Sequence, residues 1–88
     1  MFVYSVIGFP LSGGYATFHK EYKRRKNAEK QQIKLAVSGN FKSVMLRQEE
    51  VLIDKENAYV SIDSPLYSLD RDASGKITRK DYGRRVKQ

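Results

Sequence analysis

Several residue types are absent or scarce in this 88-residue chain. It has no cysteine, which excludes disulfide bonds, thiolate metal sites and a cysteine nucleophile. A single histidine excludes a histidine-rich metal site and a two-histidine mechanism within one chain. Tryptophan is absent too, although six tyrosines and four phenylalanines are present. Since the remaining residues form no catalytic constellation, we expect a protein that is not an enzyme.

Charge is absent from residues 1–19, which contain no Asp, Glu, Lys or Arg. Residues 20–34 then hold seven basic and two acidic side chains, a net charge of +5. Residues 35–63 carry −2 and residues 64–88 carry +4, so two basic ends flank a slightly acidic middle. The total of +7 suits nucleic acid, an anionic lipid surface or an acidic protein as partner, and also an ordinary solvated surface.

These shifts in composition divide the chain into three parts. They are an apolar uncharged segment at 1–19, a basic helix at 20–37 and a small C-terminal region at 40–88. Eighty-eight residues fit one small domain, or one membrane segment with a small soluble part. We expect a small α+β or mainly α fold.

The apolar N-terminal segment has two interpretations. Residues 2–9 are rich in β-branched and aromatic side chains, which favours a buried strand ended by Pro10. Alternatively, a helix over residues 1–18 would be about 27 Å long and could cross a membrane. Three small residues at a spacing of four would then form its helix-packing ridge: Gly8, Ser12 and Ala16. The positively charged residues after it would lie at the membrane surface.

Apolar residues at helical spacing predict a helix over 15–37, ended by Ser38-Gly39-Asn40. Its polar middle predicts a helix that projects into solvent or lies along a partner. Its expected basic surface consists of Lys20, Lys23, Arg24, Arg25, Lys26 and Lys30. With the nearby aromatic residues Tyr15, Phe18 and Tyr22, this surface could contact nucleic-acid phosphates and bases.

The pattern of the middle of the chain favours β-structure only in part. Residues 41–50 suit a helix or a strand almost equally. Residues 51–62 predict a hairpin with a polar turn at 54–57. Ser64 and Pro65 then have the chemistry of a helix N-cap and a first helical residue, so a helix is expected to begin there.

Residues 70–81 have the spacing of a calcium-binding loop. A hard cation needs six or seven oxygen ligands, and alternate residues of a turning backbone can supply them. The expected metal ligands are Asp70, Asp72, Ser74, the carbonyl of Lys76, Thr78 and Asp81, with Gly75 at the sharp turn. The alternative is an ordinary hairpin turn built from the same Asp, Ser and Gly residues.

Residues 65–86 thus resemble an EF-hand, with Leu66 and Leu69 before the loop and Tyr82 and Val86 after it. The resemblance implies a helix-loop-helix unit that binds calcium, or magnesium because Asp81 closes the loop in place of Glu. In outline, residues 1–36 resemble the small single-pass accessory subunits of energy-converting complexes, such as subunit e of mitochondrial ATP synthase. That resemblance implies a location in a membrane, here the mitochondrial inner membrane, and partner subunits.

Three functional hypotheses follow from these patterns. The first is a non-catalytic accessory subunit of a membrane-associated complex, which contacts protein subunits and an anionic lipid surface. The second is a soluble calcium-binding module with an EF-hand-like loop. The third is a small basic nucleic-acid-binding protein, and for the soluble alternatives the expected location is the cytoplasm.

Overall fold

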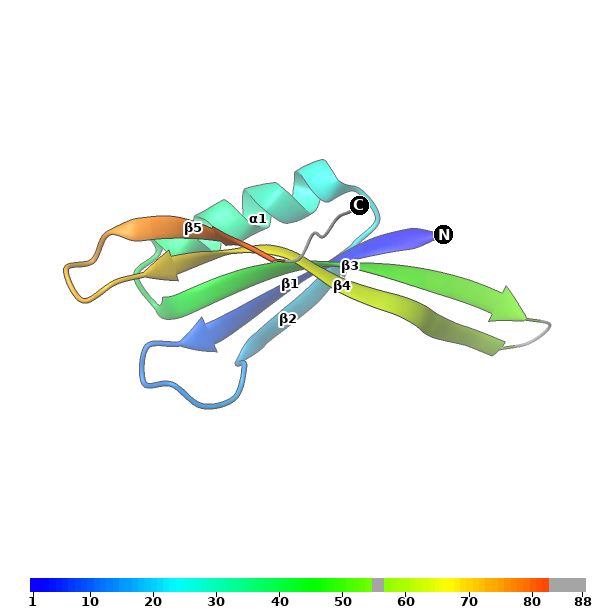
Figure 1. Cartoon of the computed structure of the whole chain (residues 1–88), viewed down its shortest axis with the longest axis horizontal. Coiled ribbons are helices and arrows are strands. Elements are labelled where there is room, and N and C mark those ends of the chain that lie inside the picture. The colour runs from blue at the N-terminus through cyan, green and yellow to red at the C-terminus, as the bar shows by residue number, and fades with distance from the viewer. Residues whose placement is uncertain (55–56, 83–88) are drawn as a thin grey trace.

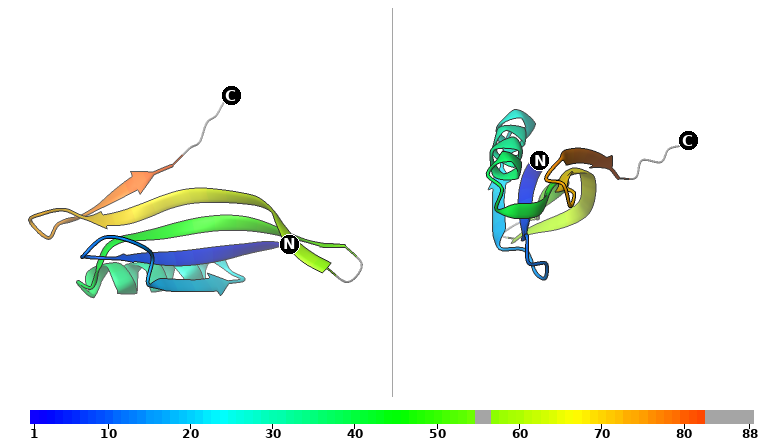
Figure 2. Two further views of the ribbon diagram at one scale, coloured as in Figure 1. Left: turned by 90° about the horizontal axis from the view of Figure 1, so that it is seen from below. Right: turned by 90° about the vertical axis from the view of Figure 1, so that its left-hand side faces the viewer.

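The computed structural model describes residues 1–54 and 57–82, with the backbone alone for the strand residues within 52–63. It is a five-stranded antiparallel sheet with one helix packed on one face (Figures 1 and 2). In chain order the elements are β1 (Phe2–Pro10), β2 (Phe18–Tyr22), α1 (Arg25–Val37), β3 (Phe41–Asp54), β4 (Asn57–Arg71) and β5 (Ile77–Asp81). The strand order across the sheet is β2-β1-β3-β4-β5. The expectation of a mainly α fold with a C-terminal helix-loop-helix is therefore wrong, because the described part is mainly β with a single helix.

The N-terminal segment is a strand and not a membrane helix. β1 lies between β2 and β3 and pairs with both, with Val6 opposite Lys20 on one side and Leu46 on the other. Gly8 lies in this strand, Ser12 in the turn after it and Ala16 just before β2, so these three residues form no helix ridge. Among the described residues, no helix is long and apolar enough to span a membrane. The single-pass interpretation and the resemblance to subunit e are thereby overturned.

The predicted helix over 15–37 is too long at its N-terminal end. Phe18, Lys20 and Tyr22 alternate along β2 and pair with Gly8, Val6 and Tyr4 of β1. Apolar residues spaced by four fit a two-residue period as well as a helical one, so Phe18 and Tyr22 did not distinguish helix from strand. The helix begins at Arg25 and ends at Val37, with Ser38 as its C-cap residue.

β3 and β4 form a long hairpin that continues through the expected helix start. Pro65 pairs with Arg47 where the register shifts between Leu46 and Arg47. A proline fits a strand at such an irregularity because no ladder hydrogen bond is required of its nitrogen. β4 therefore runs on to Arg71, and the helix expected from Ser64 and Pro65 is absent.

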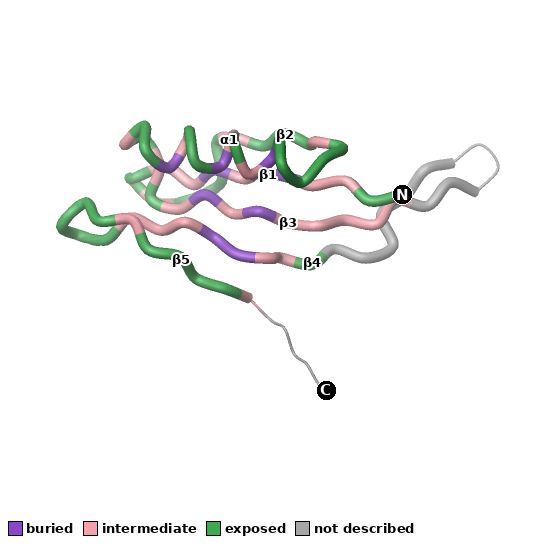
Figure 3. The backbone as a smooth tube through the Cα atoms, turned by 90° about the horizontal axis from the view of Figure 1, so that it is seen from above, coloured by how far each residue is buried: buried purple, intermediate pink, exposed green. Residues whose placement is uncertain are grey.

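The core lies between α1 and the sheet face that it covers. The sheet contributes Val6, Val44, Leu46 and Tyr67, and the helix contributes Ala28 and Ala36. Small side chains on α1 let the helix approach the sheet closely. Figure 3 shows buried positions on α1, β1, β3 and β4. The same packing fixes which side of α1 faces solvent.

Candidate functional site

One side of α1 is held on the sheet by a repeat of four. Ala28, Gln32 and Ala36 are the buried residues of the helix. The Nε2 atom of Gln32 donates a hydrogen bond to the Val44 carbonyl oxygen at 2.9 Å, which ties the middle of α1 to β3. The Oε1 atom of Gln32 is buried and has no hydrogen-bond partner among the described residues. This orientation turns the opposite side of α1 outward along its whole length.

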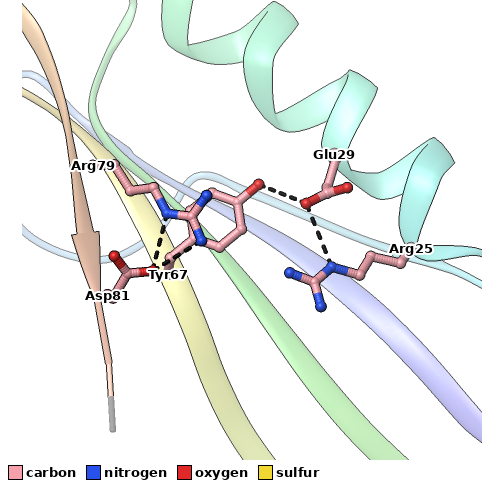
Figure 4. A network of polar contacts seen from close by, with 5 residues as sticks. All are labelled: Arg25, Glu29, Tyr67, Arg79 and Asp81. Atoms are coloured by element: carbon pink, nitrogen blue, oxygen red, sulfur yellow. Dashed lines mark hydrogen bonds and ion pairs between the residues drawn. The ribbon is translucent and has the colours of Figure 1, made fainter. Parts of the chain in front are cut away.

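The acidic side chain of α1 is drawn toward the sheet. The Tyr67 hydroxyl donates a hydrogen bond to Oε2 of Glu29 at 2.8 Å, and Nε of Arg25 lies 3.4 Å from the same oxygen. Figure 4 shows this network, in which the Arg79 guanidinium carbon stacks 3.8 Å from the centre of the Tyr67 ring. Nη2 of Arg79 also lies 2.9 Å from Oδ1 of Asp81. Glu29 is thus engaged at the flank of α1, away from its outer side.

The network also sets the proton affinity of Tyr67. Burial raises the pKa of the Tyr67 hydroxyl above 10.0, and the hydrogen bond to Glu29 and the negative charge of that carboxylate raise it further. The positive charges of Arg79 and Arg25 oppose this rise in pKa. The hydroxyl is therefore protonated at neutral pH and remains a donor to Glu29.

Arg71 ties the β4–β5 hairpin to the C-terminal end of the helix. Its Nη2 donates to the Ala36 carbonyl oxygen at 2.8 Å, and its Nη1 donates to the Gly75 carbonyl oxygen at 3.0 Å. The last four carbonyl groups of a helix lack helical partners, and a cation near them is favourable. Arg71 satisfies one of these carbonyls and so orients α1 on the sheet.

The side of α1 that faces solvent carries most of the predicted basic surface. We define the cationic face by its exposed basic residues, two just before the helix and three on it: Lys23, Arg24, Lys26, Lys30 and Lys34. Arg25 is also exposed, but it contacts Glu29. Lys20 lies apart on β2, with its Nζ atom 5.5 Å from the centre of the Tyr22 ring. Among the described residues of α1 the only acid is Glu29, so the cationic face has no acidic side chain of the helix on it.

The predicted aromatic neighbours do not join the cationic face. Phe18 and Tyr22 are strand residues packed against the core. Tyr15 is 95% exposed, but it belongs to the loop between β1 and β2. The helical spacing that grouped these three side chains with the lysines was misleading, because residues 18–22 are extended.

The 70–81 segment is a β-hairpin turn and not an EF-hand loop. β4 ends at Arg71 and β5 begins at Ile77, where an EF-hand would have two helices. The Asp72 carboxylate accepts hydrogen bonds from the backbone nitrogens of Ser74 and Lys76, each at 2.9 Å, and from the Ser74 hydroxyl at 2.7 Å. Gly75 closes the turn with a φ of +90°, which favours glycine. The same residue types satisfy both a calcium loop and a tight turn, which explains the error.

The other predicted ligands of this segment point to separate partners. Asp70 accepts a hydrogen bond from the Ser43 hydroxyl at 2.7 Å, and Asp81 contacts Arg79. Thr78 lies on β5 opposite Asp70. The Ser74 hydroxyl and the backbone bonds to Asp72 lower the pKa of its carboxyl group below 3.8. Among the described residues, no three His, Cys, Asp or Glu side chains are grouped so that they could hold a metal ion.

Sequence reasoning missed the residues that orient the cationic face. Tyr67, Gln32 and Arg71 each bond to a residue of another element, 12 to 38 positions away in the chain, so local spacing carried no signal for Gln32 or Arg71. The alternation of Tyr67 with Leu69 would have indicated the buried side of a strand if residues 64–71 had been recognised as β-structure. No family model, curated protein or solved structure matches the chain. The function is therefore inferred from this geometry.

Proposed function

We propose that this chain is a small, non-catalytic nucleic-acid-binding protein that contacts backbone phosphates through the cationic face of α1. One observation carries the proposal: exposed basic side chains follow the outer side of the helix, while its acid, Glu29, is bonded to Tyr67 at the flank. A surface with cations and no intervening acid attracts phosphates over a Debye length, which is about 8–10 Å at physiological salt.

The spacing of the lysines supports phosphate binding. Lys26, Lys30 and Lys34 follow one another at intervals of four residues, so they lie on the same side of α1, about 6 Å apart along the axis. Each lysine that neutralises a phosphate releases a condensed counterion, and this release supplies most of sequence-independent binding. Lys23 and Arg24 extend the row of cations beyond the start of the helix.

This proposal replaces the membrane-based hypothesis with the third of the sequence hypotheses. The accessory-subunit interpretation depended on a membrane helix within residues 1–19, and those residues supply β1, the β1–β2 loop and the start of β2. Of the basic residues expected at the membrane surface, Lys20 lies on β2, and the others lie between β2 and α1 or on α1, the helix that packs on the sheet. A nucleic-acid ligand agrees with the cytoplasmic location that was expected for the two hypotheses without a membrane helix.

The test is the affinity for a fluorescently labelled 20-base-pair DNA duplex, measured by anisotropy. We expect Lys30→Glu with Lys34→Glu to weaken binding at least about tenfold, because two phosphate contacts become repulsions. The matched control is Lys76→Glu with Lys80→Glu, which changes net charge equally on the β4–β5 hairpin. Circular dichroism checks that both variants fold. Equal losses in the two variants, or no binding by the unaltered chain, would overturn the proposal.

A further inference from the structure

Two apolar side chains lie on the outer side of α1, where they do not contribute to the core. Ile33 is 54% exposed and Val37 is 64% exposed. Ile33 lies three residues after Lys30, and Val37 lies three residues after Lys34, so both share the side of the helix that carries the lysines. β-Branched residues are modest helix formers, and neither is buried in the core. Phosphate binding alone does not require these two apolar side chains.

The chemistry of this surface favours one class of nucleic acid over the others. Proteins that bind single strands stack bases on aromatic side chains. The described residues of α1 include no aromatic side chain. The major groove of an RNA duplex is deep and narrow, so side chains do not reach its base edges. In B-form DNA the major groove is about 12 Å wide, admits a helix and exposes the methyl groups of thymine.

The position of α1 is suited to such a groove. The helix packs on β1, β2, β3 and β4 with its inner side, and no other described element covers its outer side (Figure 2). Its 13 residues give a length of about 20 Å. Asn27 is exposed one residue after Lys26, and a side-chain amide can pair with the edge of adenine. The outer side thus combines cations, an amide and two aliphatic groups.

We propose that α1 enters the major groove of B-form DNA, with Ile33 and Val37 against thymine methyl groups. This inference rests on the proposed function and specifies its ligand class. Lys26, Lys30 and Lys34 contact phosphates and base edges along the groove, and Asn27 lies where it can reach an adenine. Binding therefore favours duplex DNA with A·T pairs over RNA duplexes and single strands.

The experiment compares an A·T-rich DNA duplex with the same duplex in which deoxyuridine replaces thymidine. Removing the methyl groups should weaken binding roughly fourfold for each methyl that Ile33 or Val37 covers. The variant Ile33→Ser with Val37→Ser should bind both duplexes alike. Leu11→Ser with Tyr15→Ser removes exposed apolar residues from the β1–β2 loop and should keep the difference. Circular dichroism of each variant confirms folding.

Matched RNA duplex, single-stranded DNA and anionic lipid vesicles complete the comparison. Equal affinity for the thymidine and deoxyuridine duplexes, or for RNA or a single strand, overturns the groove inference and leaves the proposed function standing. Binding to vesicles of phosphatidylserine that requires Ile33 and Val37, without binding to any nucleic acid, overturns both. Preference for the thymidine duplex that is lost only in the Ile33 and Val37 variant supports the inference.

Discussion

Tyr67 joins the sheet to the helix through its hydroxyl group, which together with Arg25 holds the acid of α1 at the flank of the helix, away from the cationic face. The residue is buried, with 6% of its surface exposed, so the hydroxyl and the Glu29 carboxylate meet in a partly desolvated setting. A hydrogen bond to a charged acceptor in such a setting is stronger than one between neutral groups. Tyr67 therefore serves both the stability of the domain and the charge pattern of α1.

Replacing Tyr67 by Phe should lower the free energy of unfolding by about 1–2 kcal/mol, because a hydrogen bond to a charged group is lost while the ring is kept. The stacking contact with Arg79 survives the change, since it uses the ring and not the hydroxyl. Urea denaturation followed by circular dichroism measures the loss. The control is Tyr15→Phe, at a position that is 95% exposed. An unchanged midpoint for Tyr67→Phe would show that the bond to Glu29 contributes nothing to stability.

The residue types at 72–76 predicted a turn, but they did not decide between a metal-binding loop and a hairpin turn. Asp72, Ser74 and Gly75 at these positions suit a calcium loop and a hairpin turn, and the chain alone left both open. Strand pairing on either side makes this segment a hairpin turn. In this turn the Asp72 carboxylate accepts hydrogen bonds from the backbone nitrogens of Ser74 and Lys76. The EF-hand resemblance is wrong because two strands, and not two helices, flank these residues.

At the scale of the element, Gly8 shows how closely the first three strands are packed. A Cβ atom at Gly8 would lie 2.7 Å from Cε1 of Phe41 and 3.2 Å from Cβ of Phe18. Phe18 and Phe41 themselves meet edge to face, with ring centres 6.4 Å apart. Glycine in β1 therefore makes room for an aromatic pair contributed by β2 and β3.

The substitution Gly8→Ala should destabilise the domain by about 1–3 kcal/mol, although alanine is the better strand residue by backbone entropy. The added methyl group must displace the Phe41 ring, and that overpacking exceeds the gain in entropy. Thermal and urea unfolding measure the effect, with Ser12→Ala in the exposed turn as the control. A more stable Gly8→Ala variant would mean that the aromatic pair moves at little cost.

The ends of helices and strands could be predicted where local residue types determine them. They could not be predicted where pairing between strands determines them. The stop at Ser38-Gly39-Asn40 is where α1 ends, since Gly39 adopts a φ of +84° that favours glycine. The start was placed too early because residues 18–22 pair with β1, a contact that local spacing does not contain. Pro65 likewise suits a helix start by its residue type, but it lies in β4 and pairs with Arg47 of β3.

At the scale of the whole molecule, the cationic face should give DNA binding a defined salt dependence. The cationic face offers five basic side chains, of which about four or five can each neutralise a phosphate. The logarithm of the affinity for duplex DNA should then fall against the logarithm of the salt concentration with a slope of about −4. Lys30→Glu with Lys34→Glu should flatten this slope by about two units. Titrations between 50 and 200 mM salt supply the slope, and a value near zero would contradict phosphate binding.

By itself, the sequence determined the local properties: the basic segment after residue 19, the turn chemistry at 72–76 and the end of the helix at 38–40. Each depends on residues close together in the chain, where backbone preferences and charge act directly. Only the tertiary structure decided that residues 2–10 are a paired strand, that 64–71 continue β4 and that Glu29 turns toward Tyr67. These features arise from contacts between distant segments, and the same local patterns are compatible with other partners. The cationic face exists because such contacts bury one side of α1 and leave its lysines outside.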